Sequence, residues 1–461
     1  MELTEKATRY IAENSHKVIN TYRSWFHMEP TVGWMNDPNG LIYLNGEFHL
    51  FYQANPYSAH NEHMAWGHLV SKDLVKYREI DVALYPDSNI GESGCFSGSA
   101  FINKGELKLV YTKHLDVPEK RMCIENQFIC HTKDNVKFVK ESTPCVNPDE
   151  LPDNIAKNEF RDPQIFYYDD KTYLIVGGRT VDDKGVILFF SGKDYESFHY
   201  DFYLGPYEHT YRMVECPSFI KMGDKDVIVY STYGAKVVSN GHEIKHKVFY
   251  IIGKLNSKES TFKVDSYGAI DSGDAYYAPK VIENYKEPII IAWMENWDKD
   301  YKNTKDHEWI GSFTFPRRLR IEDNALYQEL YQGINSYIKD VKAVSSGSYI
   351  DRHSLNEFTF ESDFSLVIKG INGDIKLSKE DDKIVLNMLN SNNLNEMILK
   401  SEFSYEKGKI QVLLDTSSVE VFIDNGKETI TSRFYIYGDD FLVEYQNISN
   451  FVSKTIEVEK L

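Results

Sequence analysis

Cysteine is scarce in this chain of 461 residues, which contains only five. Their number is odd, all precede residue 217, and they show neither a Cys-x-x-Cys pair nor a Cys/His spacing typical of zinc sites. This pattern argues against a small disulfide-stapled secreted domain, and a reducing compartment is the expected setting. The cysteines are Cys95, Cys123, Cys130, Cys145 and Cys216.

Long apolar runs and basic residues are also under-represented. No run of 18 apolar residues could span a membrane, and residues 1–7 carry acidic charge where a secretion signal needs a basic start. We therefore expect a cytoplasmic protein. Lys plus Arg number 52 against 70 Asp plus Glu, and the resulting net charge of −18 disfavours nucleic acid and anionic membranes as partners.

Aromatic residues are abundant, at 14%, which suits β-structure and sugar-binding surfaces alike. A similar apolar strand begins five times, and successive starts lie 59, 66, 54 and 62 residues apart. This loose period has the size of one four-stranded blade, so the sequence predicts a five-bladed β-propeller. The strands begin at Gly46 (GEFHLFYQ), Gly105 (GELKLVYT), Lys171 (KTYLIVGG), Lys225 (KDVIVYST) and Glu287 (EPIIIAWM).

A polar cluster precedes each of these strands. Taken singly, each cluster could be an ordinary turn or strand end. Because the same point of every propeller blade lies at the same height around the central axis, we expect the five clusters to meet in one pocket. The clusters are WMNDPNG around Asp37, FSGS (96–99), RDP (161–163), ECP (215–217) and YYAP (276–279).

The strand pattern also divides the chain into domains of an all-β fold. We expect an N-terminal helical extension over 1–30, the propeller over 31–325, a helical or irregular linker over 326–347, and a C-terminal β-sandwich over 348–461. The sandwich is predicted from short alternating segments separated by Asn- and Asp-rich turns. The helical stripe of the extension is Leu3, Ala7, Tyr10, Ile11 and Val18, and that of the linker is Ala325, Leu326, Leu330 and Ile334.

Six motifs occur in a fixed order: WMNDPNG (34–40), WGH (66–68), FSGS (96–99), RDP (161–163), EC (215–216) and YAP (277–279). A lone RDP or EC would carry no information, but the ordered set resembles glycoside hydrolase family 32, the β-fructofuranosidases. The segment DTSSVEVFID (415–424) looks like the signature of that family's C-terminal β-sandwich. The resemblance thus covers nearly the whole chain.

The resemblance implies roles for three carboxylates. Asp37 is the expected nucleophile, Glu215 the general acid and then base, and Asp162 the group that stabilises the transition state through fructose hydroxyls. Cleavage through an oxocarbenium-like transition state needs one ionised and one protonated carboxyl group. The neighbours of Glu215 are expected to limit its solvation and raise its pKa.

The pocket is expected to need no metal and no cofactor, since two carboxyl groups complete this mechanism. Further substrate-binding residues are predicted around the three carboxylates. They are Trp34, Met35, Asn36, Gln53, Trp66, Phe96, Ser97, Arg161, Tyr277 and Trp293.

The predicted function is a retaining β-fructofuranosidase that hydrolyses sucrose, sucrose 6-phosphate or short fructo-oligosaccharides, as a monomer or homodimer. A fructosyltransferase or fructan β-fructosidase with the same site remains an alternative, as does a sugar-binding propeller without catalysis. In an inverting glycosidase, the carboxylates would lie roughly 6.5 to 9.5 Å apart instead of roughly 5 to 5.5 Å. Candidate cations for a substrate phosphate are Arg179, Arg212, Lys236 and His242.

Overall fold

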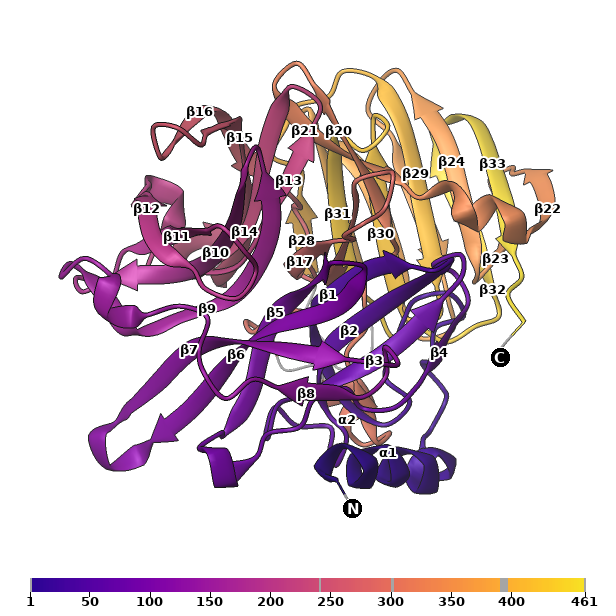
Figure 1. Ribbon diagram of the computed structural model, residues 1–461. Helices are drawn as coiled ribbons and strands as arrows, with labels where there is room; N and C mark the ends of the chain where they lie inside the picture. Colours follow the sequence, from indigo (N-terminus) through magenta and orange to yellow (C-terminus); the bar gives the residue numbers. More distant parts are fainter. Residues whose placement is uncertain (1, 240–241, 300–301, 390–396, 460–461) are drawn as a thin grey trace.

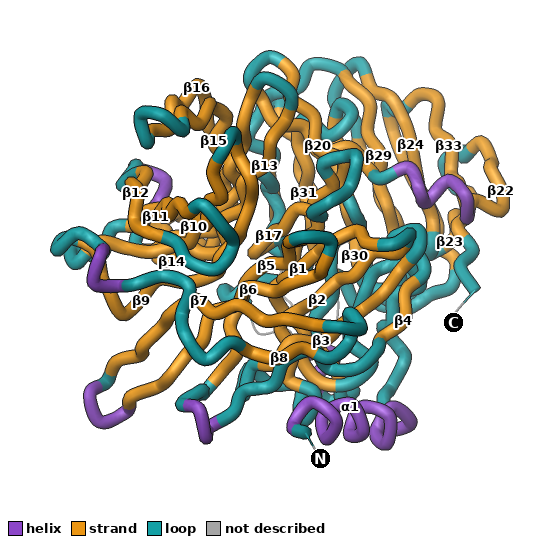
Figure 2. The backbone as a smooth tube through the Cα atoms, in the orientation of Figure 1, coloured by secondary structure: helices purple, strands orange, loops and turns teal. Residues whose placement is uncertain are grey.

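The protein consists almost entirely of β-strands, which confirms the predicted all-β fold (Figures 1 and 2). The computed structural model describes residues 2–239, 242–299, 302–389 and 397–459. Within these ranges no helix is long and apolar enough to cross a membrane. The helices are α1 (Leu3–Asn14) and α2 (Lys302–Lys305), with 3-10 turns η1 (Ser15–Lys17), η2 (Ser88–Ile90), η3 (Pro118–Lys120), η4 (Pro148–Glu150), η5 (Glu208–Thr210) and η6 (Gln332–Tyr337).

Residues 33–330 form five antiparallel sheets that follow one another along the chain. The first contains β1 (Gly33–Leu44), β2 (Glu47–Asn55), β3 (Ala65–Ser71) and β4 (Tyr77–Glu79), and the second β5 (Gly94–Asn103), β6 (Glu106–Val117), β7 (Met122–Thr132) and β8 (Phe138–Lys140). The third contains β9 (Ile155–Tyr168), β10 (Lys171–Thr180), β11 (Gly185–Gly192) and β12 (His199–Leu204). The fourth contains β13 (Met213–Met222), β14 (Lys225–Ser239), β15 (His242–Asn256) and β16 (Thr261–Ala269), and the fifth β17 (Tyr277–Val281), β18 (Ile289–Trp293), β20 (Arg317–Glu322) and β21 (Ala325–Leu330).

The first strands of the five sheets contact one another in cyclic order: β1 with β5, β5 with β9, β9 with β13, β13 with β17, and β17 with β1. A further strand, β19 (Trp309–Ile310), pairs in parallel with β1 and so joins a late segment to the first sheet. Neighbouring sheets enclose separate hydrophobic clusters. The core of this half therefore lies between the sheets, and the five first strands lie around one centre.

Each first strand is irregular at its polar cluster, where the register with the next strand shifts. In β9, β13 and β17 the bulge places Asp162, Cys216 and Ala278 at positive φ angles of 68°, 49° and 48°. A proline follows each of these three residues. Because proline has no N–H to donate, the ladder is interrupted there, and the bulge re-aims the adjacent side chains.

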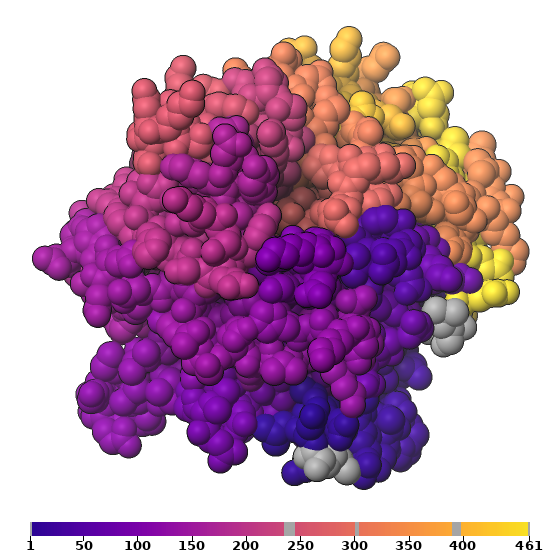
Figure 3. All heavy atoms as spheres, in the orientation of Figure 1, coloured from indigo at the N-terminus to yellow at the C-terminus, as the bar shows by residue number. Residues whose placement is uncertain are grey.

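The C-terminal part contains two six-stranded sheets that enclose one hydrophobic cluster. Figure 3 shows this part, orange to yellow, packed along one side of the N-terminal sheets. One sheet contains β22 (Ile338–Ala343), β33 (Ser449–Ile456), β24 (Ser354–Phe360), β29 (Gly408–Asp415), β30 (Ser418–Ile423) and β31 (Glu428–Arg433). The other contains β23 (Ser348–Asp351), β32 (Asp440–Gln446), β25 (Ser365–Lys369), β26 (Asp374–Glu380), β27 (Lys383–Leu389) and β28 (Met397–Lys400).

Two sequence-based expectations need correction. The predicted helical or irregular linker over 326–347 contains two strands, since β21 completes the fifth sheet and β22 pairs with β33 in the C-terminal part. Only η6 between them is helical. The helical stripe predicted for the N-terminal extension reached Val18, but α1 ends at Asn14. Ala7 is the one residue of this helix that is buried.

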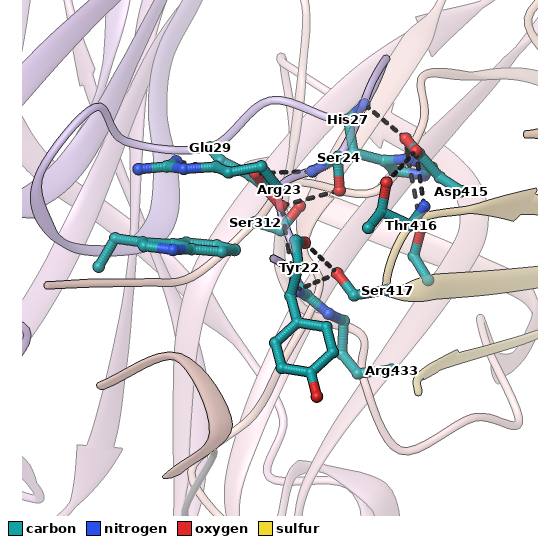
Figure 4. A network of polar contacts seen from close by, with 12 residues as sticks. Tyr22, Arg23, Ser24, His27, Glu29, Ser312, Asp415, Thr416, Ser417 and Arg433 are labelled. Carbon is teal, nitrogen blue, oxygen red and sulfur yellow. Dashed lines mark hydrogen bonds and ion pairs between the residues drawn. The ribbon is translucent and has the colours of Figure 1, made fainter. Parts of the chain in front are cut away.

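The N-terminal segment before β1 is held by a buried polar network to the C-terminal sheets (Figure 4). His27 lies 2.8 Å from Asp415 and 2.9 Å from Glu420 through its two ring nitrogens. Burial alone would lower the pKa of His27, but the hydrogen bonds to the two carboxylates raise it to about 9. Arg317 of the fifth sheet also binds Glu420, so the two halves share this network.

Candidate active site

Three carboxylates from three sheets lie in one cluster, as predicted. The thiol of Cys216 lies 3.4 Å from Asp37 Oδ2 and 3.4 Å from Asp162 Oδ2. Glu215 immediately precedes Cys216 in β13. Strands β1, β9 and β13 thus bring together side chains that are far apart in the sequence, and the bulges of these strands aim them at one another.

Neighbours on two sheets fix the orientation of Asp37. Ser97 Oγ of β5 donates to Asp37 Oδ2 at 2.7 Å, and Asn36 Nδ2 donates to Oδ1 at 3.0 Å. Trp34 Nε1 in turn donates to Asn36 Oδ1 at 2.6 Å. Burial raises the pKa of Asp37, although the hydrogen bonds from Ser97 and Asn36 act in the opposite direction.

Glu215 is bound by a cation and a hydroxyl group. Arg161 Nη2 donates to Glu215 Oε1 at 2.5 Å, and the Tyr277 hydroxyl donates to Oε2 at 2.5 Å. Burial alone would raise the pKa of Glu215, but the charge of Arg161 and these hydrogen bonds outweigh it and lower the pKa. The expectation of a raised pKa is therefore wrong in direction.

Arg161 bridges Glu215 to a second carboxylate. Its Nη1 atom lies 3.3 Å from Oε2 of Glu125, which is buried on β7. The side chains of Arg161 and Glu215 are 17% and 16% exposed, so solvent screens this pair only in part. The guanidinium charge is thus divided between Glu125 and the candidate catalytic group.

Asp162 is the most buried of the three carboxylates, with 3% of its surface exposed. It accepts the backbone N–H of Cys216 at 2.8 Å, and its own N–H donates to Thr112 Oγ1 at 2.9 Å. Burial raises the pKa of Asp162 to about 7, with Arg161 lowering it and Glu215 raising it. At neutral pH this group can therefore accept a hydrogen bond from a sugar hydroxyl or donate one to it.

Two of the predicted binding residues present buried polar atoms without a hydrogen-bond partner among the described residues: Gln53 Oε1 and Trp293 Nε1. Gln53 lies on β2, the neighbour of β1, and Trp293 lies opposite Tyr277 in the fifth sheet. Buried polar groups are nearly always bonded. Unpaired atoms on the strands beside the carboxylates therefore indicate a site for a polar ligand.

Two other predicted residues serve packing. Met35 is fully buried in the cluster between the first and fifth sheets, because its side chain points away from the pocket side of β1. Trp66 is also fully buried, and its Nε1 donates to the carbonyl of Phe96 at 3.2 Å. Phe96 itself is partly exposed and stacks on His114, with ring centroids 3.9 Å apart.

Three neighbours of the cluster were not predicted from the sequence: Trp297, Glu125 and His114. Trp297 stacks on Trp34 with ring centroids 5.9 Å apart and is 37% exposed. Its position four residues after Trp293 was the only available signal. His114 lies on β6 and Glu125 on β7, outside the repeated motifs, so the periodic pattern carried no information about them.

The predicted phosphate-binding cations are paired with carboxylates where the structure describes their side chains. Arg179 donates to Glu159 at 2.6 Å and to Asp183 at 2.9 Å. Arg212 lies 3.6 Å from Asp183 and over the ring of Tyr233. The side chains of the other two predicted cations, Lys236 and His242, lie outside the described part of the chain.

Paired carboxyl groups with different environments are the arrangement that glycoside hydrolysis requires. Asp37 and Glu215 are the two partly exposed members of the cluster, one with a raised pKa and the other bound to a cation. The third carboxylate, Asp162, is buried beside them. The fold and the site thus define a glycoside hydrolase.

Comparison with known proteins identifies the family. Residues 27–330 match the glycosyl hydrolases family 32 N-terminal domain, and residues 340–461 match the family 32 C-terminal domain. The chain therefore belongs to glycosyl hydrolase family 32, which confirms the resemblance seen in the motifs.

Curated relatives and solved structures extend over nearly the whole chain. A raffinose invertase of Escherichia coli is 28% identical over 448 residues, covering 91% of each chain. A sucrose-6-phosphate hydrolase of Bacillus subtilis is 26% identical and covers 94% of this chain and 93% of its own length. A family 32 β-fructofuranosidase from Bombyx mori superposes with a TM-score of 0.87 at 25% identity, covering 99% of this chain and 98% of its own.

Proposed function

We propose that the protein is a retaining β-fructofuranosidase that hydrolyses the terminal β-D-fructofuranosyl bond of sucrose, sucrose 6-phosphate or short fructo-oligosaccharides. The observation that carries the proposal is the convergence of Asp37, Asp162 and Glu215 around the thiol of Cys216. The relatives named as an invertase and a sucrose-6-phosphate hydrolase support this substrate class.

In the first step, Asp37 attacks the fructosyl anomeric carbon while Glu215 protonates the oxygen of the leaving group. In the second, Glu215 as base activates the water that releases fructose from Asp37. Asp162 stabilises the transition state through hydrogen bonds to fructose hydroxyls that strengthen as positive charge develops on the ring. Ser97, Asn36 and Tyr277 hold the reacting carboxyl groups in place.

The groups around Glu215 favour the protonation state that it needs in the second step over the one that it needs in the first. Arg161 and Tyr277 favour its ionised form, which is the form that acts as base. The first step needs Glu215 protonated and Asp37 ionised, so Arg161 and Tyr277 oppose the protonated form of Glu215 that this step uses. The two carboxyl groups titrate as a coupled pair, and the pH profile reports pKa values of the pair.

Paired variants test these roles. Asp37→Asn and Glu215→Gln should each lower sucrose turnover by several orders of magnitude with the fold retained. An aryl fructoside, whose leaving group needs little protonation, should partly rescue Glu215→Gln and not Asp37→Asn. Equal rescue of both would reject the assignment, as would inversion at the anomeric carbon when the first product is followed by NMR.

The preferred substrate within this class is tested by kcat/KM for sucrose, sucrose 6-phosphate and 1-kestose. We expect the 6-phosphate to be cleaved at least as well as sucrose. Because Arg179 and Arg212 are already paired with carboxylates, replacing either one should leave the ratio between these two substrates unchanged. A clear preference for 1-kestose would indicate a fructo-oligosaccharide enzyme instead.

The same proposal includes the architecture. The cyclic contacts of the first strands support a five-bladed β-propeller, and the two six-stranded sheets around one cluster support a C-terminal β-sandwich. The propeller then ends with β21 and the sandwich begins with β22. We further propose a cytoplasmic monomer or homodimer, with five free cysteines, which cell fractionation and light scattering test.

A further inference from the structure

Outside the five polar clusters, three metal-ligating side chains meet on the hairpin of β6 and β7. Cys123 and Glu125 are two residues apart on β7 and so face the same side of the sheet. His114 lies directly opposite Glu125 in the ladder. One ligand atom from each of the three residues lies within 4.8 Å of the others. Strand pairing thus assembles a group that sequence spacing alone does not reveal.

The imidazole of His114 is already oriented as metal-binding histidines are. Its Nε2 lies 3.1 Å from Asp116 Oδ1, and its Nδ1 lies 3.1 Å from Glu125 Oε1. When Nε2–H donates to Asp116, the Nδ1 lone pair points toward Glu125 and the group. A carboxylate that holds the far nitrogen of a histidine is the usual support of a metal ligand. The ring of Phe96 stacked on His114 restricts it further.

We propose that His114, Cys123 and Glu125 form a binding site for a thiophilic divalent cation such as Zn²⁺. One nitrogen, one sulfur and one oxygen ligand suit zinc, whose sites with three protein ligands keep a fourth position open. Cys123 is partly exposed and gives the ion access, whereas Glu125 is buried. The positive charge of Arg161, which lies beside Glu125, repels the cation. Binding is therefore weaker than at a structural zinc site.

The bound ion inhibits the enzyme. Glu125 is the second partner of Arg161, whose other amino group holds Glu215. A dication that takes an oxygen of Glu125 competes with the guanidinium and repels it toward Glu215, which disturbs the group that must protonate the leaving oxygen. This consequence rests on the role proposed for Glu215, whereas the binding itself does not.

Cobalt reports on the binding without any turnover. Co²⁺ added to the full-length protein should give one thiolate-to-cobalt charge-transfer band per chain. Cys123→Ser should abolish the band, and Cys145→Ser, which removes a buried cysteine outside the group, should keep it. Absence of the band in the unmodified protein, or an equal band in Cys123→Ser, would overturn the site.

Zinc tests the coupling to catalysis. Zn²⁺ should inhibit sucrose hydrolysis by the unmodified protein and by Cys145→Ser, with full recovery on chelation. The concentration for half-inhibition should rise at least about tenfold in Cys123→Ser, the scale on which metal affinity falls when a site is damaged. Equal inhibition of Cys123→Ser, or a Cys123-dependent cobalt band without inhibition, would overturn the link to Arg161 and Glu215.

Discussion

With Glu215 as the proposed general acid, we expect the charge of Arg161 to set the high-pH limb of the pH profile, and removing that charge should move the limb to higher pH. The limb of kcat/KM at high pH reports loss of the proton from the general acid of the free enzyme. Arg161 Nη2 lies 2.5 Å from Glu215 and favours the ionised carboxylate. Without this cation, Glu215 keeps its proton to higher pH, so the enzyme remains active further into the alkaline range.

The size of the shift follows from the distance and the partial burial. Opposite unit charges about 4 Å apart interact by about 4 kcal/mol at an effective dielectric constant of about 20, which corresponds to roughly 3 pKa units. Arg161 shares its charge with Glu125, so we expect Arg161→Gln to raise the apparent pKa of the basic limb by about 1 to 3 units. Its maximal rate should also fall.

A second variant, expected to shift the basic limb in the opposite direction, makes the assay decisive. Glu125→Gln removes the competing carboxylate, so Arg161 acts more fully on Glu215 and the basic limb should move to lower pH. Arg179→Gln serves as the control, because that arginine binds Glu159 and Asp183. The assay is kcat/KM for sucrose across pH. A basic limb that shifts in the same direction for Arg161→Gln and Glu125→Gln would refute the reasoning.

Three further outcomes are expected. His27 gains its proton affinity on folding, with its pKa moving from 6.5 to about 9, so its stabilising contribution is complete below pH 6.5 and is lost as pH rises through about 9. In thermal melts, His27→Gln should cost about 3 to 5 kcal/mol at pH 6 and less at pH 9.5, while the exposed His199→Gln shows no such pattern. Gly177→Ala would place its methyl 2.1 Å from a carbonyl oxygen of β13, the strand that carries Glu215, so kcat should fall by up to about 100-fold. Gly178→Ala should keep nearly full activity, because the nearest neighbour of its methyl is a leucine side chain at 3.1 Å. A chelator should leave the turnover of the purified enzyme undiminished, and a loss restored by calcium or zinc would contradict the two-carboxyl mechanism.

Repetition in the sequence predicted the candidate carboxylates because each lies at the same point of a repeated unit. Asp37, Asp162 and Glu215 all precede the second strand of a sheet, and the structure brings them together. Repetition could not identify Glu125 or His114, whose positions follow from pairing within a single hairpin. It also could not predict the direction of the pKa shift of Glu215, which depends on partners from two other sheets.

The misplaced linker has a simple physical cause. Leu326 and Leu330 are four residues apart, a spacing that fits one face of a helix and one face of a strand equally well. Gln328 between them is buried too and donates to the carbonyl of Ile270, so the inward face of β21 includes a polar residue. Because a glutamine occupies one of the buried positions, the sequence of β21 does not show the alternation of apolar and polar residues that is typical of a strand. Met35 was predicted from its place in the motif, and the motif alone could not show that its side chain packs in the cluster between the first and fifth sheets.

The hydrogen bonds between residues 25–27 and Asp415 constrain the order in which the protein can fold during synthesis. Residues 25–27 make hydrogen bonds to Asp415, at sequence separations of up to 390 residues. Strand β1 also pairs with β19, which comes late in the chain. On the ribosome, residues 25–27 emerge long before Asp415 and cannot make these bonds until the C-terminal sheets have been made. Until then, the edge of β1 and the ring of His27 are open to other chains, and unpaired strand edges of this kind make a folding chain prone to aggregate.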